Sequence, residues 1–226
     1  MASAARGGAM IQLGVLISGE GTNLQAILDS IAARKLDAQV VLVLSNVASA
    51  GGLERARRAG VPTAILSHKD YPDRESFDAA VVAKLREHGA EHVVLAGFMR
   101  IVTRVLLDAF PMRVVNIHPA LLPAFPGVHA PAQAIAYGVR VTGCTVHFVD
   151  AGTDTGPIVA QAVVPVLPDD DEASLRARIH VQEHALLPAV LQWIAEGRVS
   201  VERPPRTGRS RVRVAGLDTT ASGVAK

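Results

Sequence analysis

The strongest constraint on the fold is an alternation of short apolar runs with amphipathic stretches along most of the chain. The apolar run at residues 11–17 has the length and composition of a buried strand, and apolar residues at helical spacing follow it at Leu24, Ile27, Leu28 and Ile31. The alternation continues with strands expected at 40–44, 62–66, 93–96 and 113–117 and helices expected at 53–59 and 77–85. It predicts a single Rossmann-like α/β domain, in which helices cover both faces of a mostly parallel twisted sheet.

The pattern changes after residue 118. Prolines at positions 119, 123, 126 and 131 argue against a regular helix or a central strand over 118–131, so this segment is expected to be a functional loop. Two β-like runs follow at 142–149 and 157–166, and they predict an antiparallel strand pair at one edge of the sheet. A last helix is expected at 172–196, because three aspartates before it suit the positive end of the helix dipole.

Composition excludes several classes of function. The 226 residues are 49% hydrophobic, which is enough for one sizeable core. The net charge of +2 and an aromatic content of 4% argue against a nucleic-acid surface. No apolar run approaches the roughly 20 residues of a membrane span, and the lone Cys144 suits a reducing compartment. We expect a cytoplasmic protein that binds neither membranes nor nucleic acids, and the sequence does not predict its oligomeric state.

The domain is expected to occupy residues 10–200. Residues 1–9 have no apolar stretch of the kind found in secretory signals, and we interpret them as a leader. Residues 204–226 are small and polar, and five arginines occur between 203 and 213 without aromatic residues among them. We therefore expect 204–226 to be a weakly ordered tail rather than a nucleic-acid arm.

A glycine-bearing turn joins the first strand to the first helix. Gly21, Thr22 and Asn23 end this turn, where free backbone N–H groups and the helix dipole favour an anion. Leu24 stands where a dinucleotide fingerprint has its third glycine, and no lysine follows as in a P-loop. The turn therefore indicates a sugar monophosphate, with a plain strand-to-helix turn capped by Thr22 as the alternative.

A second group of polar residues lies at the end of the fifth expected strand. Asn116 and His118 alternate along that strand, so both side chains share one face. If Asp154, from the loop at 150–157, lies beside His118, its carboxylate raises the pKa of the imidazole and keeps it cationic. Such an imidazolium and the Asn116 amide can stabilise an oxyanion. His147 is either a third member of this group or a histidine buried in the core.

One motif points to a different chemistry. His180, Glu183 and His184 form an H-x-x-E-H pattern, as in one class of zinc hydrolases. The two histidines share one helix face. A further ligand is hard to find downstream, so a metal site is not expected, and a helix surface facing solvent or a substrate cleft is the plainer interpretation.

Several segments, taken together and in order, resemble those of the phosphoribosylglycinamide formyltransferase family. They are Ser-Gly-Glu-Gly-Thr-Asn-Leu-Gln from 18, Ala-Gly-Phe-Met-Arg-Ile from 96, Asn-Ile-His-Pro-Ala-Leu-Leu-Pro from 116, Gly-Cys-Thr-Val-His-Phe-Val-Asp from 143 and Asp-Thr-Gly-Pro from 154. The resemblance covers roughly residues 10 to 200. It implies transfer of a formyl group from 10-formyltetrahydrofolate to the amine of glycinamide ribonucleotide, a step of de novo purine synthesis, without a metal.

The resemblance also implies roles for individual residues. Asn116, His118 and Asp154 match the catalytic trio, with His147 as a possible supporting residue. The substrate-binding positions are Gly21, Thr22, Asn23, Pro119 and Glu183. The folate-binding positions are Arg74, Met99, Arg100, Ile101, Val102, Asp150, Ala151, Gly152, Thr153 and Asp154. Thr22 stands where many members have serine, and His129-Ala130-Pro131 departs from the family's His-x-His-Arg, which leaves the contacts of that loop open.

Three other functions compete with this one. The first is a sibling reaction on the same cofactor: hydrolysis of 10-formyltetrahydrofolate, or formylation of another amine such as an aminoacyl-tRNA. Enzymes of those kinds usually carry an extra domain that we do not expect in a chain of this length. The second is a zinc hydrolase built on the H-x-x-E-H helix. The third is a nucleotide-binding module without catalysis.

Overall fold

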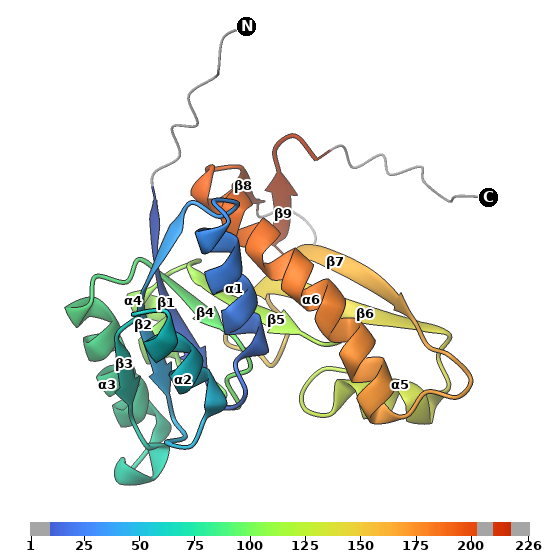
Figure 1. Cartoon of the computed structure of the whole chain (residues 1–226), viewed down its shortest axis with the longest axis horizontal. Coiled ribbons are helices and arrows are strands. Elements are labelled where there is room, and N and C mark those ends of the chain that lie inside the picture. Colours follow the sequence, from blue (N-terminus) through green and yellow to red (C-terminus); the bar gives the residue numbers. More distant parts are fainter. Residues whose placement is uncertain (1–9, 203–209, 218–226) are drawn as a thin grey trace, which may run out of the picture.

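A seven-stranded sheet forms the centre of this computed structural model, which describes residues 10–202 and 210–217 (Figure 1). In chain order its strands are β1 (Ile11–Ile17), β2 (Ala38–Ser45), β3 (Thr63–Ile65), β4 (His92–Leu95), β5 (Val114–His118), β6 (Val141–Phe148) and β7 (Ile158–Pro165). Their order across the sheet is β3-β2-β1-β4-β5-β6-β7. The first five strands are mutually parallel, whereas β6 and β7 are antiparallel to their neighbours. The mostly parallel sheet and the antiparallel pair are both confirmed.

Helices cover both faces of the sheet. On one face lie α1 (Thr22–Ala32), α2 (Gly51–Arg58) and α6 (Glu172–Ala195), which share a core with residues such as Val15 and Ile17 of β1. On the other face, α3 (Arg74–Glu87) and α4 (Arg104–Ala109) pack against Leu16 and Leu44. Because β1 is buried on both faces, successive residues face different cores, and the strand is apolar along nearly its whole length.

Two helices went unrecognised in the sequence. α4 has six residues, too few to establish a helical period, and α5 (Ala130–Tyr137) begins inside the segment expected to be a loop. Pro131 lies in the first turn of α5, where a proline removes no internal hydrogen bond. The loop therefore ends at residue 129. Between β3 and α3, a single 3-10 turn, η1 (His68–Asp70), was also not predicted.

The end of the described chain forms a second, small sheet. β8 (Val199–Glu202) pairs antiparallel with β9 (Arg211–Val214). β9 falls in the segment expected to be weakly ordered, so residues 211–214 of that segment are a strand. The expected leader at 1–9, and the parts of the tail at 204–209 and 218–226, lie outside the described residues.

The start of α6 confirms the expectation from its aspartates. Asp171 accepts a hydrogen bond from the Ser174 amide at 2.7 Å, and the Ser174 hydroxyl contacts the Asp171 amide, which forms a capping box. Asp170 binds Arg178 through two hydrogen bonds of 2.8 Å. Among the described helices, none is both long and apolar enough to span a membrane.

The topology fixes where a ligand can bind. From β1 the chain moves outward to β2 and β3 on one side, and then returns to β4 and β5 on the other. In such open sheets the connections at the carboxyl ends diverge at the switch point and leave a crevice there. Here the switch point lies between β1 and β4, so the crevice opens beside Ser18, Ala96 and His118.

Two substitutions on α6 test the packing described above. Leu187 is fully buried in the core shared with β1, whereas Val181 on the same helix is 64% exposed. We expect Leu187→Ala to lower the free energy of unfolding by about 2–5 kcal/mol through the lost apolar contact and the cavity left behind. Val181→Ala is the matched control and should change it by less than about 0.5 kcal/mol. Urea unfolding measures both, and equal effects would contradict this assignment of faces.

Candidate active site

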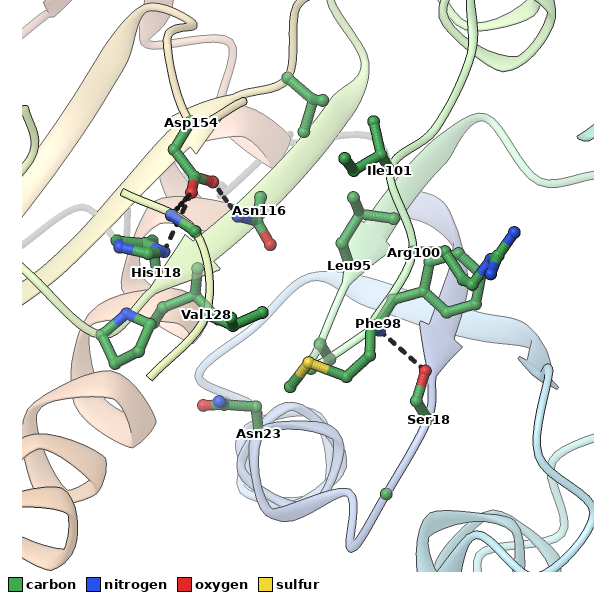
Figure 2. Close-up of a pocket in the computed structure, with 18 of the residues that line it drawn as sticks. Ser18, Asn23, Leu95, Phe98, Arg100, Ile101, Asn116, His118, Val128 and Asp154 are labelled. Carbon is green, nitrogen blue, oxygen red and sulfur yellow. Dashed lines mark hydrogen bonds and ion pairs between the residues drawn. The ribbon is translucent and has the colours of Figure 1, made fainter. Parts of the chain in front are cut away.

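A cavity of about 960 Å³ lies at the carboxyl ends of β1, β4 and β5 (Figure 2). In Figure 2, Asn116, His118 and Asp154 occupy one side and Phe98, Arg100 and Ser18 the other, and Asn23 on α1 lies below the first group. Every residue predicted for the site contributes to the cavity wall, except Ala151, which is exposed outside it. Segments far apart in sequence therefore converge on one space.

The turn after β1 approaches α2 very closely. Gly21 has a φ of 70°, which a glycine adopts without strain, and it forms the N-cap of α1. A Cβ added to Gly21 would lie 2.6 Å from the Gly52 Cα atom, and the Gly52 amide donates to the Gly19 carbonyl at 3.1 Å. No side chain caps α1, and Thr22 is its first residue rather than its cap. The N–H groups at this helix end are thus not satisfied by a capping side chain, as an anion site requires.

A buried hydrogen bond joins the start of α1 to α6. The Asn23 amide nitrogen donates to Glu183 Oε2 at 2.9 Å, and both residues are nearly inaccessible to solvent. Burial raises the pKa of Glu183, although the bond from Asn23 opposes this shift. Asn23 Oδ1 is buried without a hydrogen-bond partner. The two residues predicted to bind substrate from opposite ends of the domain are therefore in direct contact.

The segment from Met99 to Val102 forms the opposite wall and is fixed at both ends. Ser18 Oγ donates to Asn46 Oδ1 at 2.6 Å and accepts from the Met99 amide at 2.8 Å. At the other end, the Thr103 amide donates to the buried Asp78 carboxylate at 2.5 Å. Between these anchors the side chains of Met99 and Ile101 are 71% and 57% exposed. Two such apolar side chains beside a cavity suit a flat apolar ligand.

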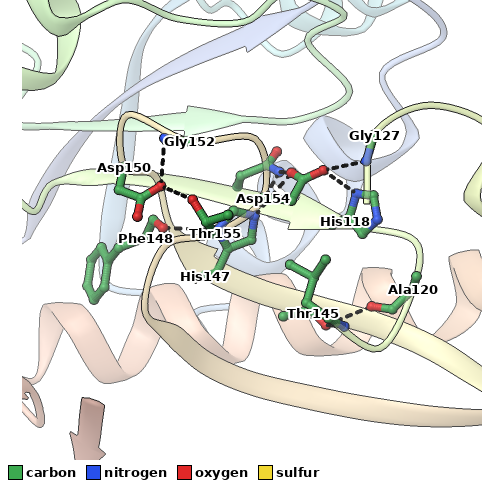
Figure 3. Close-up of polar contacts among 12 residues, drawn as sticks. His118, Ala120, Gly127, Thr145, His147, Phe148, Asp150, Gly152, Asp154 and Thr155 are labelled. Carbon is green, nitrogen blue, oxygen red and sulfur yellow. Dashed lines mark hydrogen bonds and ion pairs between the residues drawn. The ribbon is translucent and has the colours of Figure 1, made fainter. Parts of the chain in front are cut away.

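The predicted polar centre is assembled around Asp154 (Figure 3). Its Oδ2 atom lies 3.4 Å from His118 Nδ1 and accepts a hydrogen bond from the Gly127 amide at 2.8 Å. Its Oδ1 atom lies 3.5 Å from the Asn116 amide nitrogen and 3.7 Å from His147 Nε2. Asp154 has a φ of 54°, a left-handed conformation that aspartate tolerates but rarely adopts. All three predicted catalytic residues and His147 thus form one cluster.

Two opposing effects act on the charge of His118. Burial lowers the pKa of His118, and this outweighs the opposing effects of Asp154 and of the Phe125 carbonyl, so the net shift is downward. Asp154 favours the charged ring, as the sequence predicts, but the desolvation of a ring that is 4% exposed acts in the opposite direction and is the larger of the two effects. Burial also raises the pKa of Asp154, but hydrogen bonds from His147 and Gly127 lower it overall, so Asp154 stays ionised.

The proline-rich loop closes over this cluster through its backbone. His118 Nε2 donates to the Phe125 carbonyl at 2.8 Å, which places a hydrogen on Nε2. Phe125 has a φ of 52°, and Gly127 next to it donates to Asp154. These contacts could not be predicted from residue types, because they are made by backbone N–H and C=O groups. The departure at His129-Ala130-Pro131 coincides with the start of α5, and His129 and Pro131 both line the cavity.

Two other residues of the cavity wall were not predicted as site residues, although their spacing in the sequence indicates them. Arg176 and His180 line the cavity together with Glu183. Their spacing of four and three residues places all three on one face of α6. The H-x-x-E-H pattern had identified only part of this face. Ser18 stood at the head of the phosphate turn, but its role in holding Met99 could not be deduced without the fold.

The zinc interpretation of α6 finds no support in the arrangement of its side chains. His180 and His184 stack on each other with ring centroids 5.8 Å apart, and Glu183 is hydrogen-bonded to Asn23. Within the described ranges, no group of three or more His, Cys, Asp or Glu residues is arranged to hold a metal ion. The pattern is explained instead by a helix face that borders the cavity.

Comparison with known proteins identifies the class of protein as a formyl transferase. Residues 11–191 match the Formyl transferase family, and the chain belongs to it. Glycinamide ribonucleotide transformylase 1 from Symbiobacterium toebii is 51% identical, with a TM-score of 0.87 over 93% of this chain and 95% of that one. The phosphoribosylglycinamide formyltransferase of Escherichia coli (strain K12) is 44% identical over 83% of this chain and 88% of its own length. Within the family, the chain is therefore a member of the phosphoribosylglycinamide formyltransferases, which confirms the resemblance found in the sequence.

A longer relative contains the same domain. The trifunctional purine biosynthetic protein adenosine-3 of Drosophila pseudoobscura pseudoobscura is 48% identical over 82% of this chain. The match spans only 14% of that protein's length. The likeness therefore concerns one domain of the longer protein.

The electrostatics of the cluster can be measured directly. We expect His118 to titrate below the ordinary histidine pKa of about 6.5, because burial disfavours the charged ring. In Asp154→Asn the pKa should fall further, because the carboxylate that opposes this shift is gone. NMR titration of the histidine ring signals, assigned with a His118→Gln variant, measures both values. A wild-type pKa above 6.5, or one that rises in Asp154→Asn, would contradict the charge assignment.

Proposed function

We propose that the chain transfers the formyl group of 10-formyltetrahydrofolate to the primary amine of glycinamide ribonucleotide. One observation carries this proposal: His118, Asn116 and Asp154 lie together in a cavity that also borders the uncapped start of α1. The ribonucleotide phosphate binds at Gly21, Thr22 and Asn23. The folate lies along the wall that contains Met99 and Ile101, and the formyl group lies between the two sites.

The ribonucleotide and the folate are held by different walls of the cavity. Glu183 and Asn23 face the sugar, where the unpartnered Asn23 oxygen can accept a hydroxyl hydrogen. Pro119, directly after β5, borders the same side. Arg74, Arg100 and Val102, with Asp150, Gly152 and Thr153, border the folate side. Holding both substrates in register converts a bimolecular reaction into one within a complex.

His118 carries the proton during transfer. The amine nitrogen attacks the formyl carbon, and a tetrahedral intermediate forms with a positive nitrogen and a negative oxygen. Neutral His118 accepts the amine proton on Nδ1, beside the Asp154 carboxylate, which stabilises the imidazolium. The imidazolium stabilises the negative oxygen and then returns the proton to the departing folate nitrogen as the carbon–nitrogen bond breaks. Burial lowers the pKa of His118, which suits this role, since the ring must first act as a base.

The reaction itself is the first test. Purified protein given 10-formyltetrahydrofolate and glycinamide ribonucleotide should form one formylated ribonucleotide for each folate deformylated. Without the ribonucleotide, deformylation should be slower by at least about a hundredfold, because the attacking amine is missing. Equal rates with and without the ribonucleotide would show a hydrolase instead. Asp154→Asn should lower kcat by about 10²–10⁴, with KM for folate within a few fold.

Two adjacent glycines on α2 test the phosphate site. A Cβ at position 52 would lie 2.5 Å from the Ile17 Cδ1 atom and 3.1 Å from the Gly21 backbone. A Cβ at position 51 would meet only the mobile side-chain end and the Cα of Glu20, at 3.0 Å and beyond. Gly52→Ala should therefore raise KM for the ribonucleotide about tenfold, at unchanged KM for folate, by displacing the phosphate turn.

Gly51→Ala is the matched control, and it should change neither KM by more than about twofold. Steady-state kinetics with each substrate varied in turn gives both constants. An increase in KM for folate alone would place the phosphate elsewhere in the cavity. Equal effects of the two substitutions would mean that the close approach of Gly52 to Gly21 does not position the turn.

A further inference from the structure

We propose that Arg55, a residue of α2 outside the cavity, is a positioning residue for the phosphate site: its guanidinium holds the Glu20 carbonyl and thereby turns the Gly21 N–H group into the cavity. The proposal rests on the proposed function, which assigns the substrate phosphate to this turn. The contacts of Arg55 are independent of that assignment. No motif marks this residue, which is one of three arginines on α2.

Arg55 reaches the phosphate turn with two different nitrogens of its guanidinium. Nε donates to the Glu20 carbonyl oxygen at 2.8 Å, and Nη1 donates to Gln25 Oε1 at 3.3 Å. Glu20 lies directly before Gly21, the N-cap of α1, and Gln25 lies in the first turns of that helix. Arg55 is half-buried and borders a separate hollow beside Gln25 and Asp29, not the cavity. The guanidinium therefore connects the turn with the helix from outside the site.

The side chain of Gln25 is oriented to accept this contact. Its amide nitrogen donates to Asp29 Oδ1 at 2.8 Å, one helical turn further along α1. The oxygen, on the other branch of the amide, is thus left to face Arg55. Arg55 meets an acceptor at both contacts. Because the guanidinium is planar and its N–H groups form one rigid fork, two acceptors fix its orientation.

Two successive carbonyls of the turn are held toward α2. The Gly52 amide donates to the Gly19 carbonyl at 3.1 Å, and Arg55 donates to the Glu20 carbonyl. A peptide unit is planar and trans, so its C=O and N–H groups point in opposite directions. With both carbonyls toward α2, the N–H groups of Glu20 and Gly21 point away from it. Both residues line the cavity, so these two N–H groups are directed at it.

The direction of the Gly21 N–H group matters for an anion at this turn. It adds a donor to the free N–H groups at the start of α1, and together they form a concave set of the kind that binds phosphate. Gly21 has a φ of 70° and lacks a Cβ, so the unit between Glu20 and Gly21 can rotate at low cost. Rotation would point the Glu20 carbonyl oxygen at the phosphate. The hydrogen bond from Arg55 opposes this rotation.

The other two arginines of α2 provide a comparison on the same helix. Arg57 and Arg58 have side chains that are 52% and 71% exposed, and they pair with Glu54 at 3.7 and 3.6 Å. Exposed pairs of this kind contribute little to stability. Arg58 carries the same charge as Arg55 on the same helix, so a substitution there is a matched control for the loss of charge.

Nitrogen-15 NMR tests the direction of the Gly21 N–H group without any reaction. Ribose 5-phosphate is the probe, because it carries only the sugar and its phosphate. We expect its binding to the wild type to shift the backbone amide signal of Gly21, whereas the signal of Gly89, after the end of α3, stays in place. A Gly21 signal that saturating ribose 5-phosphate leaves unshifted would overturn the proposal. If Gly21 shifts but the wild type transfers no formyl group, the proposed function alone fails.

Two substitutions at position 55 separate the hydrogen bond from the charge. In Arg55→Gln the side-chain amide nitrogen is bonded to Cδ, as Nε is in arginine, so it can still donate to the Glu20 carbonyl. Arg55→Met has a similar length but no donor, and both variants lose the positive charge. We expect Arg55→Met to raise KM for the ribonucleotide, and Kd for ribose 5-phosphate, at least about tenfold. Arg55→Gln should keep both within about threefold of the wild type.

The remaining constants show whether the effect is confined to the phosphate site. The kcat and the KM for folate should stay within about threefold in both variants, because Arg55 contacts neither the folate wall nor Asp154. The control Arg58→Met should change neither KM by more than about twofold. A normal KM for the ribonucleotide in folded Arg55→Met would overturn the proposal. Equal increases in the Met and Gln variants would overturn it in favour of charge, and a rise in KM for both substrates in favour of a general structural role.

Discussion

The carboxylate of Asp154 is the group on which the arrangement of the site depends. It accepts a hydrogen bond from the Gly127 backbone, lies 3.4 Å from His118 Nδ1, and is within 3.7 Å of both Asn116 and His147. These contacts connect the proline-rich loop, β5, β6 and the loop after β6 to one half-buried charge. The left-handed backbone at Asp154 is retained because these partners fix the side chain from several directions.

The sheet supplies the geometry that makes this possible. β4 and β5 are parallel and pair Leu95 with Asn116, so β5 continues two residues past its neighbour, which carries His118 into the crevice. The switch to an antiparallel β6 then places His147 opposite Asn116. The strands thus hold the cluster. The phosphate turn is held by a backbone hydrogen bond from Gly52 to Gly19, and the Met99 segment by the hydrogen bond from the Met99 amide to the Ser18 hydroxyl.

Much of this could be predicted from particular residues. The sheet could be predicted from the apolar run at 11–17 and the other apolar runs, and the last helix from the aspartates that end at Asp171. The spacing of apolar residues and the capping of a helix are both local properties of the chain. The trio was found because strand alternation places Asn116 and His118 on one face, and because the motifs resembled a family. The charge of His118 could not be predicted, since desolvation depends on what covers the ring. The Asn23–Glu183 contact and the anchoring of the cavity wall at Asp78 could not be predicted either. Each depends on packing between distant segments.

The central claim is that the Asp154 cluster lies at the reacting atoms. A crystal structure of the protein with glycinamide ribonucleotide and a folate analogue that cannot release its formyl group tests it most directly. The account predicts the formyl oxygen within hydrogen-bonding distance, about 3 Å, of the Asn116 side chain. The formyl-bearing nitrogen should lie beside His118, and the phosphate on the first turn of α1. A complex with both substrates bound, but with the amine and the formyl group away from residues 116, 118 and 154, would contradict the account.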